Sequence, residues 1–202
     1  TYHDIDRIFF THNHPDHVCD LIPFLFSSRY QLDTRKKDLE IIAGPGFQDF
    51  FDKLMLAFKH WLKPTEYKLN ISEIDEGIRD FGKLKVQVGK VKHIAMSRGY
   101  RFTNDQGKSV AVSGDTDYCE GMIELGRDVD LMILECAWPD DEKTDGHLGP
   151  TLAGKLAMEA NCKKLCLTHF YPPCDLEKIR TTVQENYKGE LLLARDLMQF
   201  VL

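Results

Sequence analysis

The sequence has no apolar stretch of about 20 residues, the length that a membrane-spanning helix needs. It has no tandem repeat, no low-complexity segment and no linker. It also lacks an excess of positive charge, because 26 lysines and arginines stand against 32 aspartates and glutamates and give a net charge of −6. We therefore expect one globular domain over residues 1–202, with no membrane partner and no strong general nucleic-acid binding.

No two of the six cysteines form a C-x-x-C pair, and a chain of 202 residues does not depend on disulfides for its stability. We therefore expect reduced thiols in a cytoplasmic protein. The chain begins at Thr1, without a methionine or a signal peptide, and runs almost at once into a predicted strand; we therefore expect it to begin within a longer chain, and no targeting signal can be read from it.

Apolar patterns typical of strands and apolar patterns typical of helices both occur along the chain, and together they predict an α/β layered domain. Predicted strands cover residues 6–10, 39–43, 67–74, 84–93, 100–105, 109–115, 130–138, 164–170, 191–196 and 200–202. Predicted helices cover residues 17–32, 47–62, 118–128, 150–161 and 176–187. Pro23 predicts a kink or break in the first helix, Pro150 suits a first helical position, and NDQG at 104–107 predicts a hairpin turn.

Four ligand-type residues follow the first predicted strand: His12, His14, Asp16 and His17. Imidazole and carboxylate together suit zinc, iron or manganese. His12 and His14 are two residues apart in an extended segment and can point the same way. Asp16 and His17 are adjacent at the start of a helix and diverge, which favours a second, nearby metal ion. A solvated polar loop is the alternative interpretation.

The segment THNHPDH at 11–17 resembles the T-H-x-H-x-D-H signature of the metallo-β-lactamase superfamily. Three later segments resemble motifs of its ribonuclease Z-like branch in the same order: VKHIAMSRGYRF with His93, VAVSGDTDY with Asp115, and LCLTHFYP with His169. The resemblance covers nearly the whole chain. It implies a metallo-β-lactamase-like αβ/βα sandwich of two mixed sheets.

The resemblance also implies two divalent metal ions, zinc in the first place and manganese or iron as alternatives. The implied ligands are His12, His14 and His93 for one ion, Asp16, His17 and His169 for the other, and Asp115 as the bridge. Taken singly, His93 and His169 would more often be ordinary polar residues. Asp115 alone could be a helix cap, a role for which Asp117 is the stronger candidate.

Glu135 and His147 match a pair that lies near the metals in ribonuclease Z-like proteins, where the histidine contacts the scissile group. A histidine oriented by a carboxylate is a sensible general acid or oxyanion partner. With Asp16, these two residues are the candidate catalytic residues. The alternative for His147 is an exposed loop residue.

The implied function is a metal-dependent hydrolase that uses a hydroxide shared by two metals, most simply a phosphodiesterase acting on a small-molecule or short nucleotide substrate. Only 21 residues separate His93 from Asp115. That leaves no room for the long arm with which the branch grips tRNA, so tRNA 3′ processing is disfavoured, and the basic RKK at 35–37 is interpreted as a solvated turn. The alternatives are a lactone or thioester hydrolase on the same metals and a non-catalytic binding member.

The superfamily normally has several strands before its first histidine motif, and here about ten residues precede it. We therefore expect a short first sheet with an exposed edge, covered either by a homodimer or by a longer native chain.

Overall fold

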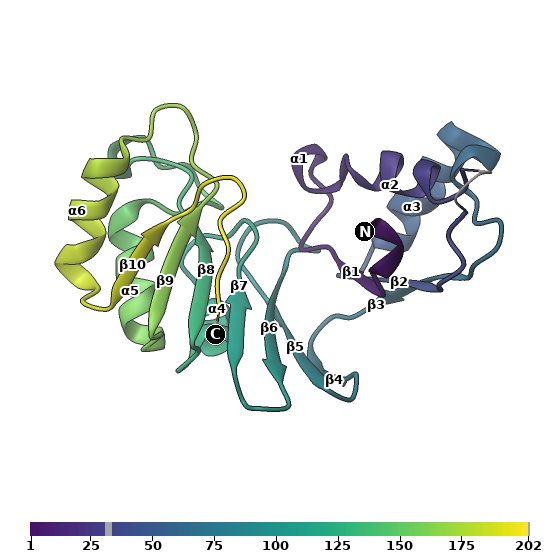
Figure 1. The fold of residues 1–202 in the computed structure, drawn as a ribbon. Helices are drawn as coiled ribbons and strands as arrows, with labels where there is room; N and C mark the ends of the chain where they lie inside the picture. Colours follow the sequence, from purple (N-terminus) through teal and green to yellow (C-terminus); the bar gives the residue numbers. More distant parts are fainter. Residues whose placement is uncertain (31–33, 202) are drawn as a thin grey trace. The chain divides into compact units, whose positions relative to one another are not determined.

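The computed structural model describes residues 1–30 and 34–201 (Figure 1). The chain divides into two compact units, Thr1–Asp75 and Glu76–Leu202. The first contains a three-stranded sheet in the order β1-β2-β3, and the second contains a seven-stranded sheet in the order β10-β9-β8-β7-β6-β5-β4. This combination of sheets and helices is the α/β architecture that the sequence predicts.

The first unit builds its sheet from parallel strands, with Ile8 opposite Ile41 and Ile41 opposite Ile71. Its elements are η1 (Tyr2–Asp4), β1 (Arg7–Phe9), α1 (Pro15–Val18), α2 (Leu21–Ser27), β2 (Leu39–Ala43), α3 (Phe47–Phe58), η2 (Lys59–Leu62) and β3 (Leu69–Glu73). Among the described residues β1 is an edge strand of this short sheet, as predicted. Phe10, just after β1, stacks on Phe47 of α3 with 5.0 Å between ring centroids. This contact anchors the start of the histidine-rich loop.

The helix predicted over residues 17–32 is instead two short helices, α1 and α2, which are separated at Cys19 and Asp20. Pro23 lies in the first turn of α2. Backbone N–H groups there have no partner within the helix, so a proline, which lacks the N–H, costs no helical hydrogen bond. The break therefore precedes the proline. Residues 31–32 of the predicted helix lie outside the described residues.

Arg35 corrects the interpretation of RKK as a solvated turn, because its side chain is fully buried. The guanidinium donates hydrogen bonds to the backbone carbonyls of Tyr2 (2.9 Å), Ile5, Lys37 (2.6 Å) and Asp38 (3.1 Å). Carbonyl dipoles thus satisfy a buried charge whose planar donors fit several acceptors at once. Arg35 fixes the opening segment of the first unit.

The second unit combines antiparallel strands β4 to β7 with parallel strands β7 to β10. Its elements are β4 (Gly77–Asp80), β5 (Leu84–Lys90), β6 (Arg98–Asn104), β7 (Ser109–Val112), α4 (Glu120–Gly126), β8 (Leu131–Glu135), η3 (Asp140–Glu142), α5 (Pro150–Ala160), β9 (Lys164–Thr168), α6 (Leu176–Asn186) and β10 (Glu190–Leu193). Pro150 is the first residue of α5, as predicted. Residues 200–201, predicted to be in a strand, are in neither a helix nor a strand.

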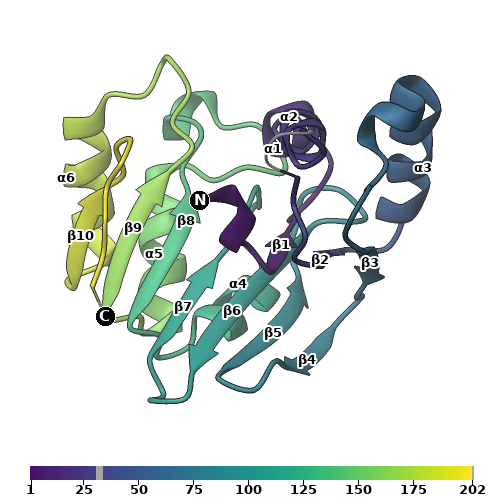
Figure 2. The ribbon, with the colours of Figure 1, turned by 45° about the vertical axis from the view of Figure 1, so that its right-hand side comes forward.

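Helices α4, α5 and α6 cover one face of the seven-stranded sheet (Figures 1 and 2). Their apolar residues, among them Leu125, Leu156 and Val183, pack on β8 and β9 in one continuous core. A Cβ on Gly154 would lie 2.8 Å from the Val183 carbonyl oxygen, so a glycine there permits close packing of α5 on α6. Because helices cover this face of the sheet, the carboxyl ends of its parallel strands are held in fixed positions.

All six cysteines are free, in agreement with the predicted reduced state. Within the described part of the chain, no helix combines the length and the apolar character needed to cross a membrane.

Asp130 joins three segments of the second unit and should contribute measurably to its stability. Its carboxylate accepts hydrogen bonds from Lys163 Nζ (2.9 Å) and the Ser109 backbone N–H (2.9 Å), and these lower its pKa to about 2. A carboxyl group whose pKa is lowered by folding stabilises the fold above its unfolded pKa, and that contribution is lost as pH falls toward about 2.

We expect Asp130→Asn to lower the free energy of unfolding by about 1–2 kcal/mol at pH 7, as measured by urea denaturation. The difference from the parent should shrink below pH 4. Asp105→Asn, in the exposed β6–β7 turn, is the matched control. An equal loss in both variants would show that Asp130 has no special role.

Candidate metal centre

In the first unit, a loop and a short helix, α1, follow directly after β1. His12 is fully buried and His14 is partly buried, and Pro15 begins α1 with His14 as the residue before it. Asp16 and His17 are the next residues of α1. A proline favours the first position of a helix. The extended backbone of His14 and this helix start therefore place four ligand-type side chains within six residues.

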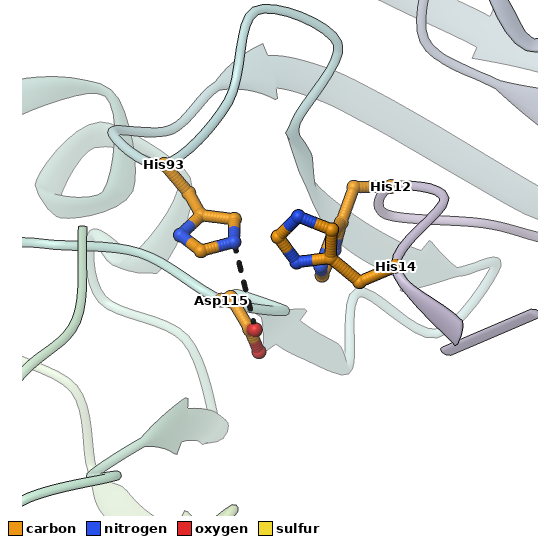
Figure 3. A group of neighbouring side chains, drawn as sticks. All are labelled: His12, His14, His93 and Asp115. Carbon is orange, nitrogen blue, oxygen red and sulfur yellow. Dashed lines mark ion pairs between the residues drawn. The ribbon is translucent and has the colours of Figure 1, made fainter. Parts of the chain in front are cut away.

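These side chains lie close together within the first unit. The ring centroid of His12 is 4.6 Å from that of His14 and 4.1 Å from that of His17. His17 Nε2 lies 3.4 Å from an Asp16 carboxylate oxygen. Figure 3 draws the His12 and His14 side chains on their loop. The first unit thus gathers three imidazoles and one carboxylate, as the sequence predicts.

In the second unit, Asp115 lies in the turn that follows β7 and is 2% exposed. Gly114 precedes it with a φ of 60°, a left-handed conformation that glycine adopts at little cost. This turn carries the Asp115 carboxylate away from the strand and toward two histidines of the same unit. Asp115 Oδ2 lies 3.7 Å from His93 Nε2, and Oδ1 lies 3.5 Å from His169 Nε2.

His93 is oriented through its other ring nitrogen. Its Nδ1 donates a hydrogen bond to the Gly146 carbonyl oxygen at 2.9 Å, since a carbonyl can only accept. This bond fixes the position of the Nδ1 proton, and Nε2 is the ring nitrogen that faces Asp115 (Figure 3). Gly146 has a φ of +86°, and a Cβ there would lie 2.9 Å from His93 Nδ1.

His169 follows β9 and has a φ of 62°, in the left-handed region that L-residues rarely adopt. Such a conformation costs about 1–3 kcal/mol and persists where surrounding structure enforces it, often at functional sites. Here it turns the imidazole at the end of a parallel strand toward Asp115. The strained backbone at His169 therefore places its side chain beside Asp115.

Glu135 is buried at the end of β8 and holds His147. Its Oε1 lies 2.8 Å from His147 Nδ1. The same carboxylate accepts three backbone N–H groups, from Thr116 (3.0 Å), Ala137 (3.0 Å) and Leu148 (3.2 Å). The hydrogen bond that His147 donates to the Glu135 carboxylate raises the pKa of His147. The pair predicted from the sequence is present, and it engages Nδ1 of His147, so Nε2 is the other ring nitrogen.

One ligand atom from each of Asp115, His147 and His169 lies within 4.8 Å of the others. Neutral imidazole nitrogens and a carboxylate oxygen are donors that zinc and related divalent ions bind. Within the second unit, Asp115 and the two histidines beside it, His93 and His169, therefore offer donors that suit a divalent metal ion, and so does the histidine-rich loop of the first unit.

Asp117 is not the helix cap that the sequence predicts. Helix α4 begins at Glu120, and the Asp117 carboxylate instead accepts hydrogen bonds from Lys143 Nζ (2.9 Å) and Lys92 Nζ (3.4 Å). The Gly146 N–H also donates to it at 3.4 Å. Asp117 thus fixes the loop that carries Gly146 and His147, and sequence reasoning missed Lys143 because its partner is 26 residues away.

The family model described as "Beta-lactamase superfamily domain" matches residues 1–170. The chain belongs to this superfamily. An uncharacterized protein of Mycobacterium tuberculosis, Rv1339, is 30% identical over 91% of this chain and 68% of its own length. Ribonuclease Z of Brevibacillus brevis is 27% identical over 83% of this chain and 69% of its own length.

Among solved structures, the metallo-beta-lactamase fold protein YhfI of Bacillus subtilis superposes with a TM-score of 0.81 at 24% identity. The match covers 96% of this chain and 76% of YhfI. The superfamily and the fold predicted from the sequence are thereby confirmed. Members of this beta-lactamase superfamily are metal-dependent hydrolases, and its fold implies that divalent metal is bound.

Proposed function

We propose that the chain is a metal-dependent hydrolase of phosphodiesters, with a short nucleotide or another small molecule as substrate. The observation that carries the proposal is the Glu135–His147 pair, held at 2.8 Å beside Asp115 and His169. A histidine fixed through one nitrogen can present the other to a phosphoryl oxygen or a leaving group. Ribonuclease Z, whose name denotes cleavage of RNA, is among the relatives of this chain.

We further propose that the chain binds two divalent ions, zinc in the first place. The residues that would hold one ion are His12, His14 and His93, those that would hold the other are Asp16, His17 and His169, and Asp115 would be a ligand of both. Their imidazole and carboxylate donors suit zinc. When bound, such ions supply a strongly nucleophilic water at neutral pH and polarise the substrate's oxygen.

The side chains have separate roles around that chemistry. The Gly146 carbonyl accepts a hydrogen bond from Nδ1–H of His93 and so fixes the tautomer in which Nε2 would be the metal-binding nitrogen. Glu135 fixes His147 in the same manner and favours its protonated form. The His147 Nε2–H then donates to the developing charge on a phosphoryl oxygen or to the departing oxygen. Asp16, half-exposed at the start of α1, is a metal ligand that also positions the attacking water.

A hydrolase of lactones or thioesters is the second candidate, because the same metals polarise a carbonyl oxygen equally well. Such an enzyme would depend far less on His147. We expect protein purified without chelator to contain between one and two metal ions per chain by elemental analysis. It should cleave bis(4-nitrophenyl) phosphate faster than a simple lactone.

The metal measurement and the turnover measurement decide different questions. Metal-free protein with correctly folded side chains would contradict the proposed ligands. Lactone turnover far above phosphodiester turnover would move the assignment to the second candidate. Metal-loaded protein that turns over neither would favour a substrate outside both classes or a non-catalytic member.

A further inference from the structure

An aromatic pair, Trp138 and Tyr171, lies beside the histidines of the second unit. The two ring centroids are 4.9 Å apart and the ring planes meet at 82°, an edge-to-face arrangement. The Tyr171 ring lies 5.1 Å from the His169 ring and 6.1 Å from the His147 ring. The chemistry proposed above uses neither aromatic side chain.

The position of this pair indicates a role other than packing. Phe170 packs against the hydrophobic core of the second unit, whereas its neighbour Tyr171 and Trp138 belong neither to that core nor to the side chains packed on it. Both are half-buried. Each of the two side chains is therefore partly exposed to solvent, beside the histidines that the proposed chemistry uses.

Backbone hydrogen bonds fix both residues in place. The Tyr171 N–H donates to the Ala137 carbonyl at 3.1 Å, and the Trp138 N–H donates to the Leu148 carbonyl at 3.4 Å. These bonds join the segment after β8, the segment before α5 and the segment after β9 into one frame. The same frame carries the two histidines, so the aromatic surface keeps a set distance from them.

Resting on the proposed function, we propose that Trp138 and Tyr171 bind a planar aromatic group of the substrate, a nucleobase attached to the phosphodiester. Stacking on rigid aromatic side chains tolerates any base, because every base has a π-face. The substrate class is therefore a nucleotide phosphodiester, recognised at its base by these two rings and at its phosphorus by the histidines.

The charges next to Trp138 favour a small substrate over a polynucleotide. Asp140, Asp141 and Glu142 form a short helix two residues after it, and together with Asp175 and one cation, Lys178, they line a cavity of about 320 Å³. A further phosphate that entered this cavity would meet four carboxylates against one lysine and would be repelled. A neutral base can approach the same surface without this cost, so one or two nucleotides fit better than a long chain.

Fluorescence can test the binding surface independently of hydrolysis, because the chain has only two tryptophans, Trp61 and Trp138. In a Trp61→Phe variant of the full chain, Trp138 is the only indole. We expect adenosine 5′-monophosphate to quench its emission and to bind about tenfold more tightly than ribose 5-phosphate, which carries the same phosphate without a base. Equal affinities for the two ligands would overturn the inference.

Kinetics supply the second measurement. Trp138→Leu and Tyr171→Leu should each raise KM for thymidine 5′-(4-nitrophenyl phosphate) about tenfold while kcat changes less than about threefold. Trp138→Phe should retain most of the affinity, which separates stacking from a fault in folding. Trp61→Leu, a change at an exposed tryptophan of the first unit, is the matched control.

The outcomes for this inference and for the proposed function can be distinguished. Phosphodiester hydrolysis with unchanged KM in both leucine variants would overturn the aromatic site alone. Base-dependent quenching in a protein that cleaves no phosphodiester would overturn the proposed function and leave the base-binding surface standing.

Discussion

Replacing His147 with alanine should lower the turnover of bis(4-nitrophenyl) phosphate by about 10²-fold or more, the usual scale for losing a positioned acid–base group. The metal content should hardly change, because His147 is not assigned as a metal ligand. The physical reason is the 2.8 Å contact to Glu135, which commits Nδ1 and leaves Nε2 to act on the substrate. Steady-state kinetics and elemental analysis of the same preparation measure the two effects.

The control for this variant is His60→Ala, at an exposed histidine of η2. His147 is a cleaner target than Glu135, because the glutamate also accepts three backbone N–H groups and its loss would disturb the fold. If His147→Ala lost metal in proportion to activity, the residue would be a ligand. If His147→Ala kept full activity on a lactone but lost activity on the phosphodiester, His147 would be needed for the phosphodiester reaction alone.

Asp115→Ala should reduce the content of both metal ions and abolish measurable turnover, whereas Asp16→Ala should mainly remove one. Asp115 is proposed as the bridge and is 2% exposed, with one oxygen near His93 and the other near His169. Losing it would remove a ligand from each ion and the carboxylate that offsets their charge. We expect well under one metal per chain in Asp115→Ala and about one in Asp16→Ala.

Asp20→Ala, at an exposed carboxylate between α1 and α2, is the matched control for the first unit. Thermal unfolding should accompany the metal measurements, since Asp115 is buried. Equal metal contents in the Asp16 and Asp115 variants would show that the bridging assignment is wrong, whether both retained the parent's content or both lost the same amount.

Sequence patterns located most strands and helices of this fold because the buried segments carry strong periodicity. The parallel strands β8 and β9 are continuous apolar runs, as strands covered by helices require. The edge strand β4, Gly77–Asp80, was missed because all four of its residues are exposed and show no apolar pattern. The buried Arg35 was misjudged because its partners are backbone carbonyls, which no side-chain pattern reveals.

Most of the candidate site could be found from the sequence because its residues stand at strand ends in recognisable motifs. His12, Asp115 and His169 each follow a strand closely, and a polar residue at that place is conspicuous. The roles of Lys143 and Asp117 could not be found, because their contact joins segments far apart in the chain. Trp138 and Tyr171 did carry a signal: each lies within three residues of a predicted site residue.

The frame that joins the segments after β8 and β9 carries two sets of side chains with different proposed roles. The histidines act on the bond that is broken, and the two aromatic rings select the substrate. The rigidity of the frame comes from main-chain hydrogen bonds, such as that from Tyr171 to Ala137, which do not depend on side-chain identity. Exchanging the rings at 138 and 171 for other side chains would therefore leave the histidines where they are. Descendants of such a protein could diverge toward new substrates by single substitutions, without rebuilding the machinery that breaks the bond.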